Sequence, residues 1–125
     1  MHEPPRSYWL RKFRVALGGL LWAMRTEVNF RIHLPLAVAV VAAAAWLGAS
    51  PIEWCVLVLC VTIVLAAETF NTALEHLARA ITRETNEQVR RALDAAAGAV
   101  LVASIGAALT GSIIFATRLA QWLGW

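Results

Sequence analysis

Three long apolar segments follow a mixed N-terminal segment in this chain. No Asp, Glu, Lys or Arg occurs in residues 34–52, 54–67 or 95–117. A helix that crosses a bilayer needs roughly 20 mostly apolar residues. The first and third segments are long enough alone, whereas the second must continue through Glu68. The pattern predicts membrane-spanning helices at 34–49, 51–80 and 89–119, with a cytoplasmic connection at 81–88.

The N-terminal segment has a different pattern. Residues 1–7 are predicted to be a loose tail. From 8 to 33, apolar residues recur at helical spacing with basic residues between them, which is typical of an amphipathic helix on a membrane surface. We therefore expect a single all-α membrane domain over 8–125, made of this surface helix and three spanning helices. Three helices bury little surface among themselves, so we also expect the chain to form oligomers.

Composition and charge agree with this interpretation. The chain is 60% hydrophobic and has a mean hydropathy of +0.65. Six of its 11 Lys and Arg residues precede Leu34, and four more lie in 79–91. Because Lys and Arg concentrate in cytoplasmic loops, the N-terminus and the 81–88 connection are predicted to be cytoplasmic. The excess of basic residues is then explained by topology and anionic lipid, without a nucleic-acid partner.

The second apolar segment ends in a polar face. A helix turns about 100° per residue, so Asn71 and Glu75 lie about 60° and 20° from Glu68, and Arg79 continues the same face. Counted from Pro51, Glu68 lies about 25 Å along the helix, near the inner edge of a bilayer core of about 30 Å. Acidic residues at this depth are costly and usually mark function. Glu68 is thus expected at the depth of the lipid and Glu75 at the depth of the headgroups and cytoplasm, so these residues do not form a proton path across the bilayer.

Two more acids are expected at this height. Glu27 lies just before the first spanning helix, and Asp94 lies where the third helix enters the membrane. A few carboxylates together with substrate phosphates suit Mg²⁺, and one uncoordinated acid can accept a proton from an alcohol. The alternative is that Glu75 pairs with Arg79 and that Glu68 is merely tolerated near the interface. His33 is expected at the interface without a role.

Four motifs resemble those of the prokaryotic diacylglycerol kinase and undecaprenol kinase family. They are ETFNTALEHL (68–77), FRVALGGL (13–20), EVNFR (27–31) and DAAAGAV (94–100), which occur in the family's order and cover the chain from Phe13 to the end of the third spanning helix. The resemblance implies a homotrimer in a bacterial plasma (inner) membrane, with active sites between subunits. It also implies transfer of the γ-phosphate of ATP to a membrane lipid alcohol.

The resemblance assigns residue roles by motif. Glu68 is implied to be the general base, with Asn71 ordering the catalytic site. Glu27 and Glu75 are implied to hold Mg²⁺. The nucleotide is implied to contact Glu27, Glu75, Arg79, Glu84, Asn86 and Asp94. The lipid is implied to contact Phe13, Gly19, Phe30, Arg31, Glu68 and Ala97.

Two positions depart from the family pattern. Arg79 stands where the family has Asp, and Leu93 stands where it has the Lys that contacts ATP phosphates. We hypothesise that Arg79 supplies this charge, since Arg90 and Arg91 are expected to point elsewhere. The alternative is a catalytically silent member that binds lipid or nucleotide. A small proton-coupled transporter is disfavoured by the inward depth of Glu68. The sequence does not separate undecaprenol from diacylglycerol as the substrate.

Overall fold

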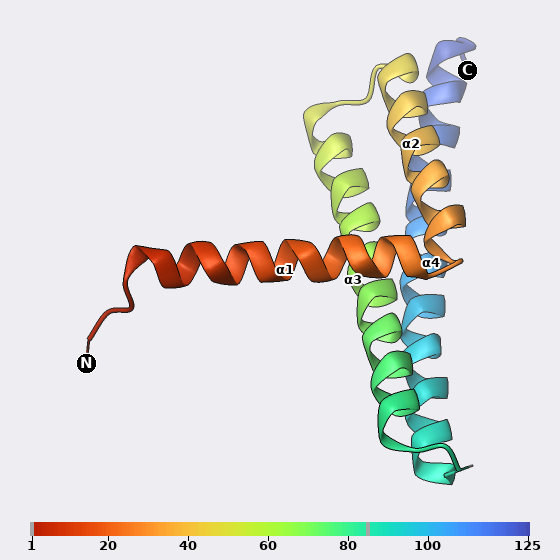
Figure 1. Cartoon of the computed structure of the whole chain (residues 1–125). Helices are drawn as coiled ribbons and strands as arrows, with labels where there is room; N and C mark the ends of the chain where they lie inside the picture. The colour runs from red at the N-terminus through yellow and green to blue at the C-terminus, as the bar shows by residue number, and fades with distance from the viewer. Residues whose placement is uncertain (1, 85) are drawn as a thin grey trace.

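A computed structural model describes residues 2–84 and 86–125, and over these residues the chain is entirely helical. The elements are α1 (Arg6–Thr26), α2 (Phe30–Leu47), α3 (Pro51–Ile81) and α4 (Glu87–Trp122) (Figure 1). The helices α2, α3 and α4 are each long and apolar enough to cross a membrane. The prediction of three helices of membrane-spanning length is therefore confirmed.

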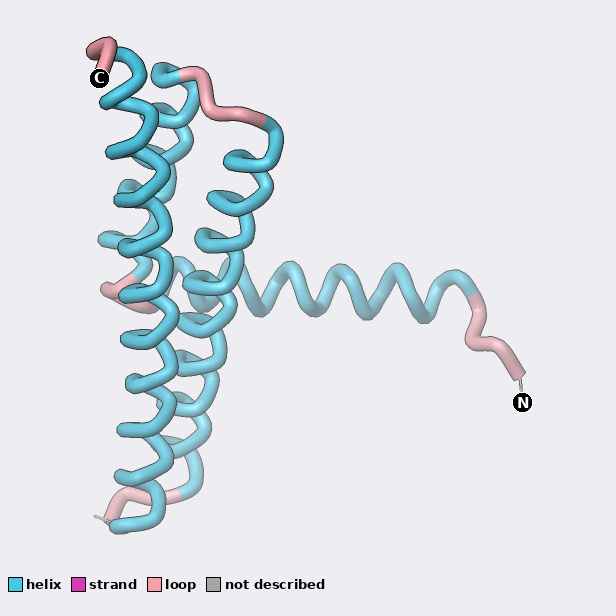
Figure 2. The backbone as a smooth tube through the Cα atoms, turned by 180° about the vertical axis from the view of Figure 1, so that it is seen from behind, coloured by secondary structure: helices cyan, strands magenta, loops and turns pink. Residues whose placement is uncertain are grey.

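The three long helices form one elongated bundle. The antiparallel helices α3 and α4 pack along their length and make the most extensive contact between any two helices, while α2 packs on both of them (Figures 1 and 2). The 18 residues of α2 span about 27 Å, whereas the 31 of α3 span about 46 Å and the 36 of α4 about 54 Å. The ends of α3 and α4 next to the 82–86 connection consequently extend well beyond α2.

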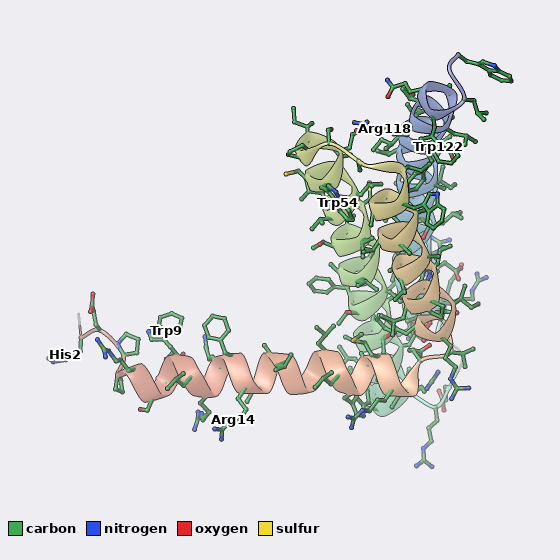
Figure 3. All side chains as sticks on the ribbon, turned by 90° about the horizontal axis from the view of Figure 1, so that it is seen from above. His2, Trp9, Arg14, Trp54, Arg118 and Trp122 are labelled. Atoms are coloured by element: carbon green, nitrogen blue, oxygen red, sulfur yellow. The ribbon has the colours of Figure 1, made fainter. Side chains whose placement is uncertain are left out.

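The first helix stands nearly perpendicular to the bundle. It crosses close to the middle of α3 and then leaves the bundle, so that the N-terminus lies far from the other helices (Figures 1 and 2). Its last turns contact α3 and α2, and the Trp22 ring packs edge-on against His76 with 4.6 Å between ring centroids. Trp9 and Arg14 leave α1 on opposite sides (Figure 3). A helix on a membrane surface separates its aromatic and basic groups in this way, and the surface location of α1 stays a prediction.

The segment expected to be one surface helix over 8–33 is divided into two helices. The first ends at Thr26, residues 27–29 form a turn, and α2 starts at Phe30. The Thr26 hydroxyl donates to the carbonyl oxygen of Trp22 at 2.9 Å, and Glu27 adopts an extended backbone. Such local hydrogen bonds offer the backbone an alternative to continuing the helix. The turn allows α1 to lie across the bundle while α2 runs along it.

The loop between α2 and α3 has strong local signals for ending one helix and starting another. Gly48 adopts the left-handed conformation (φ 70°) that commonly ends a helix. Ser50 and Glu53 then form a capping box: the Glu53 amide donates to the Ser50 hydroxyl and the Ser50 amide to the Glu53 carboxylate. Pro51 occupies the first turn, where its missing N–H costs nothing.

Few side chains are buried within the single chain. The buried apolar residues are Ala23, Phe30, Ala44, Leu57 and Val64. All of α4 lies in the described part of the chain, and none of its residues is buried. Lipid tails are as apolar as leucine, so a membrane protein needs no large apolar core to stay folded. The exposed apolar surface is therefore what a membrane-embedded chain requires.

An ion pair joins α3 and α4 at the end of the bundle where the C-terminus lies. Arg118 donates through Nε (2.7 Å) and through Nη2 to the same oxygen of Glu53. Both side chains are largely shielded, with 26% and 19% of their surfaces exposed. Figure 3 shows Arg118 beside the start of α3. By contrast, the Arg91–Glu87 pair at the opposite end is well exposed.

The Glu53–Arg118 pair is predicted to stabilise the α3–α4 contact. In a double-mutant cycle of Glu53→Gln and Arg118→Leu, we expect a clearly favourable coupling free energy, because the first change removes the charge that strengthens these hydrogen bonds and the second removes their donors. The measurement is the free energy of unfolding by denaturant titration in detergent micelles. The matched cycle of Glu87→Gln and Arg91→Leu should give no more than about 0.5 kcal/mol, since that pair is solvated. Equal coupling in both cycles would contradict the prediction.

Candidate functional site

Glu68 is fully buried where the α1–α2 turn meets α3. Its side chain has 0% exposure, although it lies in a helix of membrane-spanning length. Asn29, in the turn, donates from Nδ2 to Oε1 of Glu68 at 2.9 Å. Thr72 donates its hydroxyl to the Glu68 carbonyl oxygen at 2.9 Å. The break between α1 and α2 is therefore also the feature that brings a donor to this carboxylate.

The second oxygen of Glu68 has no hydrogen-bond partner among the described residues. Nε2 of His33 lies 3.6 Å from this oxygen. That separation is longer than a hydrogen bond, whose N···O distance is about 2.7–3.2 Å. A buried carboxylate oxygen left unpaired is costly, and it is suited to accept a hydrogen bond from a bound molecule.

The polar face predicted on this helix is present. Asn71, which is 4% exposed, donates from Nδ2 to Oε1 of Glu75 at 3.1 Å. The side-chain oxygen Oδ1 of Asn71 has no hydrogen-bond partner among the described residues. Glu75 is half-buried and bonded to Asn71. The ion pairs recorded for the described residues do not include one between Glu75 and Arg79. The alternative in which Glu75 simply neutralises Arg79 is therefore not the arrangement observed.

A pocket of about 440 Å³ lies between the ends of α3 and α4 next to the connection. It gathers five of the six residues predicted for nucleotide binding: Glu75, Arg79, Glu84, Asn86 and Asp94. Glu27, the sixth, is not among its lining residues and lies in the α1–α2 turn. The set predicted from scattered motifs thus converges, apart from one member.

The pocket also includes a residue that was expected elsewhere. Arg90 was predicted to point away from the nucleotide, yet it lines this pocket together with Leu93. Arg91 does point elsewhere and pairs with Glu87 at 3.1 Å. The prediction was wrong for Arg90 because helical position alone does not show how far a long, flexible side chain reaches across to the facing helix.

The predicted metal ligands form only a partial set within one chain. Across residues 2–84 and 86–125, no group of three or more His, Cys, Asp or Glu side chains is arranged to hold a metal ion. Mg²⁺ in phosphate-transfer sites is held by one or two carboxylates plus substrate phosphates, so it does not require such a group. The oxygen donors of Glu75 at the pocket fit this mode of binding.

The residues predicted to contact lipid are more dispersed. Phe13 and Gly19 lie on the exposed part of α1, Arg31 is exposed at the start of α2, and Ala97 is exposed on α4. Phe30 is fully buried, so a lipid contact there needs a surface that the single chain does not expose. Of this set, only Glu68 combines burial with an unpaired polar atom.

Two polar residues near Glu68 were missed by the sequence reasoning, Asn29 and His33. They are four apart and flank the buried Phe30, so both lie on the side of the turn and first helical turn that faces α3. The signal was present in the string NFRIH at 29–33, where two polar side chains interrupt the approach to an apolar segment. It does not identify their partner, because Glu68 lies 39 positions from Asn29 and 35 from His33 in the sequence.

The arrangement defines a class of protein. It is a helical protein with three helices of membrane-spanning length, a buried carboxylate on α3, and a pocket with charged residues further along α3 and α4. The sequence pattern of the prokaryotic diacylglycerol kinase family matches residues 14–115, and the chain belongs to that family. This membership assigns it to the lipid kinases.

Individual relatives agree with this assignment. The chain is 40% identical over 106 residues to a diacylglycerol kinase of Synechocystis, covering 84% of this chain and 61% of that protein. It is 33% identical over 118 residues to the undecaprenol kinase of Bacillus subtilis, covering 94% and 96% of the two chains. It is 29% identical over 110 residues to a diacylglycerol kinase of Haemophilus influenzae, covering 87% and 93%. The chain therefore matches less than two thirds of the length of the Synechocystis relative and nearly all of the other two.

Removing the donor to Glu68 is predicted to impair lipid phosphorylation. In Asn29→Ala, the buried Oε1 loses a charge-assisted hydrogen bond of about 1.5–3 kcal/mol, which corresponds to a loss of about tenfold to a hundredfold in kcat/KM for the lipid. The measurement is transfer of labelled phosphate from ATP to lipid in mixed micelles. The neighbouring exposed position provides the control, Val28→Ala, which should match the wild type. A wild-type rate in Asn29→Ala would show that the hydrogen bond does not position the carboxylate.

Proposed function

We propose that this protein transfers the γ-phosphate of ATP to the hydroxyl of a membrane lipid alcohol, either undecaprenol or diacylglycerol, at the cytoplasmic interface. One observation carries the proposal: a fully buried Glu68 keeps one carboxylate oxygen unpaired near the inner end of a spanning helix. Family membership supports the reaction type. Of the relatives, one is named a diacylglycerol kinase and another an undecaprenol kinase.

The proposed step is a direct displacement at phosphorus. The unpaired oxygen of Glu68 accepts the proton of the lipid hydroxyl while the hydroxyl oxygen forms a bond to the γ-phosphorus. The bond from that phosphorus to the bridging oxygen of ADP breaks, and ADP leaves with the bonding electrons. The products are the lipid phosphate, ADP and a protonated Glu68, which returns its proton to water. Asn29 orients the carboxylate, and Asn71 orients Glu75.

The nucleotide is proposed to bind in the pocket between the ends of α3 and α4. Arg79 faces this pocket and is suited to bidentate contacts with phosphate. Glu75 and Glu27 would hold Mg²⁺, which would neutralise charge on the phosphates of ATP. Because Glu27 does not line the pocket of its own chain, a site using both carboxylates is proposed to be shared between two copies.

The assembly is proposed to be a homotrimer in a bacterial plasma membrane, with the N-terminus in the cytoplasm. The absence of any buried residue on α4, all of which is described, supports an oligomer, since small and apolar helix faces associate in lipid. The basic residues of α1 and of the 82–86 end of the bundle support the orientation.

Glu68→Gln tests the proposed base. The change keeps the shape and the hydrogen bond from Asn29 but cannot accept a proton, so turnover should fall about a hundredfold to ten-thousandfold. ATP binding should stay unchanged, because Glu68 does not line the nucleotide pocket. The assay is label transfer from ATP to a panel containing undecaprenol and dioleoylglycerol. Glu87→Gln, an exposed carboxylate outside the pocket, is the control. Label transfer that survives Glu68→Gln would remove Glu68 from this role.

Arg79→Ala tests the phosphate contact. Loss of a guanidinium that faces phosphate should raise the KM for ATP about tenfold and leave the KM for the lipid unchanged. Arg91→Ala is the matched control, since Arg91 lies on the facing helix and pairs with Glu87 instead of lining the pocket. If the two variants have the same KM for ATP, Arg79 does not bind the nucleotide.

A further inference from the structure

The pocket between the ends of α3 and α4 has its charged side chains at two levels. On α3 it is lined by Glu75 and Arg79, and on α4 by Arg90 and Asp94. In each pair the two residues are four apart, which is about 6 Å of helix rise. Because α3 and α4 run antiparallel on either side of the 82–86 connection (Figure 1), both arginines lie nearer the connection and both carboxylates lie nearer the three-helix part. Each level thus takes one residue from each helix.

Acids outnumber bases among the residues that line this pocket. The charged members are three acids and two arginines, namely Glu75, Glu84, Asp94, Arg79 and Arg90. A chain of phosphates would bring more negative charge into these surroundings, and like charges at close range repel. An anion of this kind therefore needs both guanidinium groups of the pocket close to it.

Arg90 is held only loosely in its observed position. Its Nη2 lies 3.9 Å from Oε1 of Glu87, beyond the distance of a hydrogen bond, and its side chain is 62% exposed. The same oxygen of Glu87 accepts a hydrogen bond from Arg91 at 3.1 Å. Glu87 therefore keeps a partner when Arg90 turns toward another anion, and the exposed contact that is given up contributes little to stability.

Arg90 is also on the side of α4 that faces α3. A rotation of about 100° per residue places Arg90 about 40° from Asp94 and about 60° from Leu93, and all three line the pocket. Leu93 brings no charge to this face. The side chain of Arg90 is consequently the cation that α4 presents to the pocket, opposite Arg79 on α3.

We propose that Arg79 and Arg90 hold the phosphates of the nucleotide between them, with one guanidinium from each helix. This inference rests on the proposed function and adds Arg90 as a phosphate-binding residue. Guanidinium groups make bidentate hydrogen bonds to phosphate oxygens. Arg79 lies about 16 Å along α3 from Glu68, so the two arginines are at the end of the site remote from the proposed base. They hold the phosphates that stay with the nucleotide, and ADP depends on them as ATP does.

Arg90→Ala is expected to weaken the binding of ADP. Loss of one of two guanidinium groups should raise the Kd for ADP about tenfold. The measurement is fluorescence anisotropy of N-methylanthraniloyl-ADP with the full chain and Mg²⁺ in detergent micelles. The adjacent Arg91→Ala is the matched control, because Arg91 pairs with Glu87 and does not line the pocket. Equal weakening by the two changes would reveal an effect of net charge alone and would overturn the inference.

A second set of variants separates a phosphate contact from a structural role. In Arg90→Ala combined with Leu93→Lys, a cation returns to the same helix face one turn further on, and the Kd should recover to within about threefold of the wild-type value. This recovery would also exclude misfolding as the cause of the defect in Arg90→Ala. Glu87→Gln removes only the neighbouring carboxylate and should leave the Kd unchanged. If Arg90 merely held Glu87, Glu87→Gln would weaken binding as much as Arg90→Ala, and Leu93→Lys would restore nothing; either result overturns the inference.

ADP binding is measured without phosphate transfer, so the inference and the proposed function can fail separately. A wild type that transfers no label to lipid but binds ADP in an Arg90-dependent manner refutes the function and supports the two-arginine site. A wild type that transfers label, with the same Kd for ADP in Arg90→Ala, refutes the two-arginine site and leaves the function standing. A wild type that binds no ADP also refutes the site.

Discussion

A carboxylate buried in an apolar helix must be hydrogen-bonded, and this requirement explains much of the local structure around Glu68. Its helix neighbours satisfy only part of its polar surface, through the Thr72 hydroxyl on its carbonyl oxygen. The donor to its side chain comes from Asn29, which belongs to a turn and not to a helix. If α1 and α2 were one continuous helix, Asn29 would belong to a helix that crosses the bundle, and its side chain would be held at a fixed position on that helix. The turn frees it to reach α3, and the same turn fixes the perpendicular crossing of α1 (Figure 1).

The length difference between the helices separates two chemical environments along one helix. Beyond the crossing of α1, α3 and α4 continue as a pair without α2, and their pocket collects charged and polar side chains. On the other side of Glu68 the three-helix part encloses an apolar cavity. Glu68 lies between these two regions and Glu75 is about 10 Å further along the same helix. The distance between the buried carboxylate of Glu68 and the pocket at Glu75 is therefore set by the rise of a single helix, which is rigid.

The sequence predicted those features that depend on one helix at a time. The charge-free segments predict spanning helices because the bilayer fixes their length, and the 100° rotation per residue predicts that Glu68, Asn71 and Glu75 share a face. The periodicity of single helices did not predict contacts that depend on where another helix lies, and the gathering of Glu75, Arg79 and Asp94 from two helices was expected only from the family resemblance. The Asn29 and His33 contacts with Glu68 span 39 and 35 positions of sequence, and the Glu53–Arg118 pair spans 65. The cavity escaped prediction for the same reason, since a run of small residues allows either close packing or empty space.

Leu93 is an apolar residue among charged side chains of α3 and α4. Leu93 lines the pocket between α3 and α4 and gives it no charge, so a lysine at this position would have been one of several cations there. Arg79 from α3 and Arg90 from α4 line the same pocket, and Nη2 of Arg90 lies 3.9 Å from Oε1 of Glu87, a weak and exposed pairing. An exposed pair of this kind contributes about 0–1 kcal/mol, whereas a guanidinium on a phosphate makes stronger, bidentate hydrogen bonds. Release of Arg90 from Glu87 therefore costs little, and the pocket has arginines from two helices although Leu93 brings no charge.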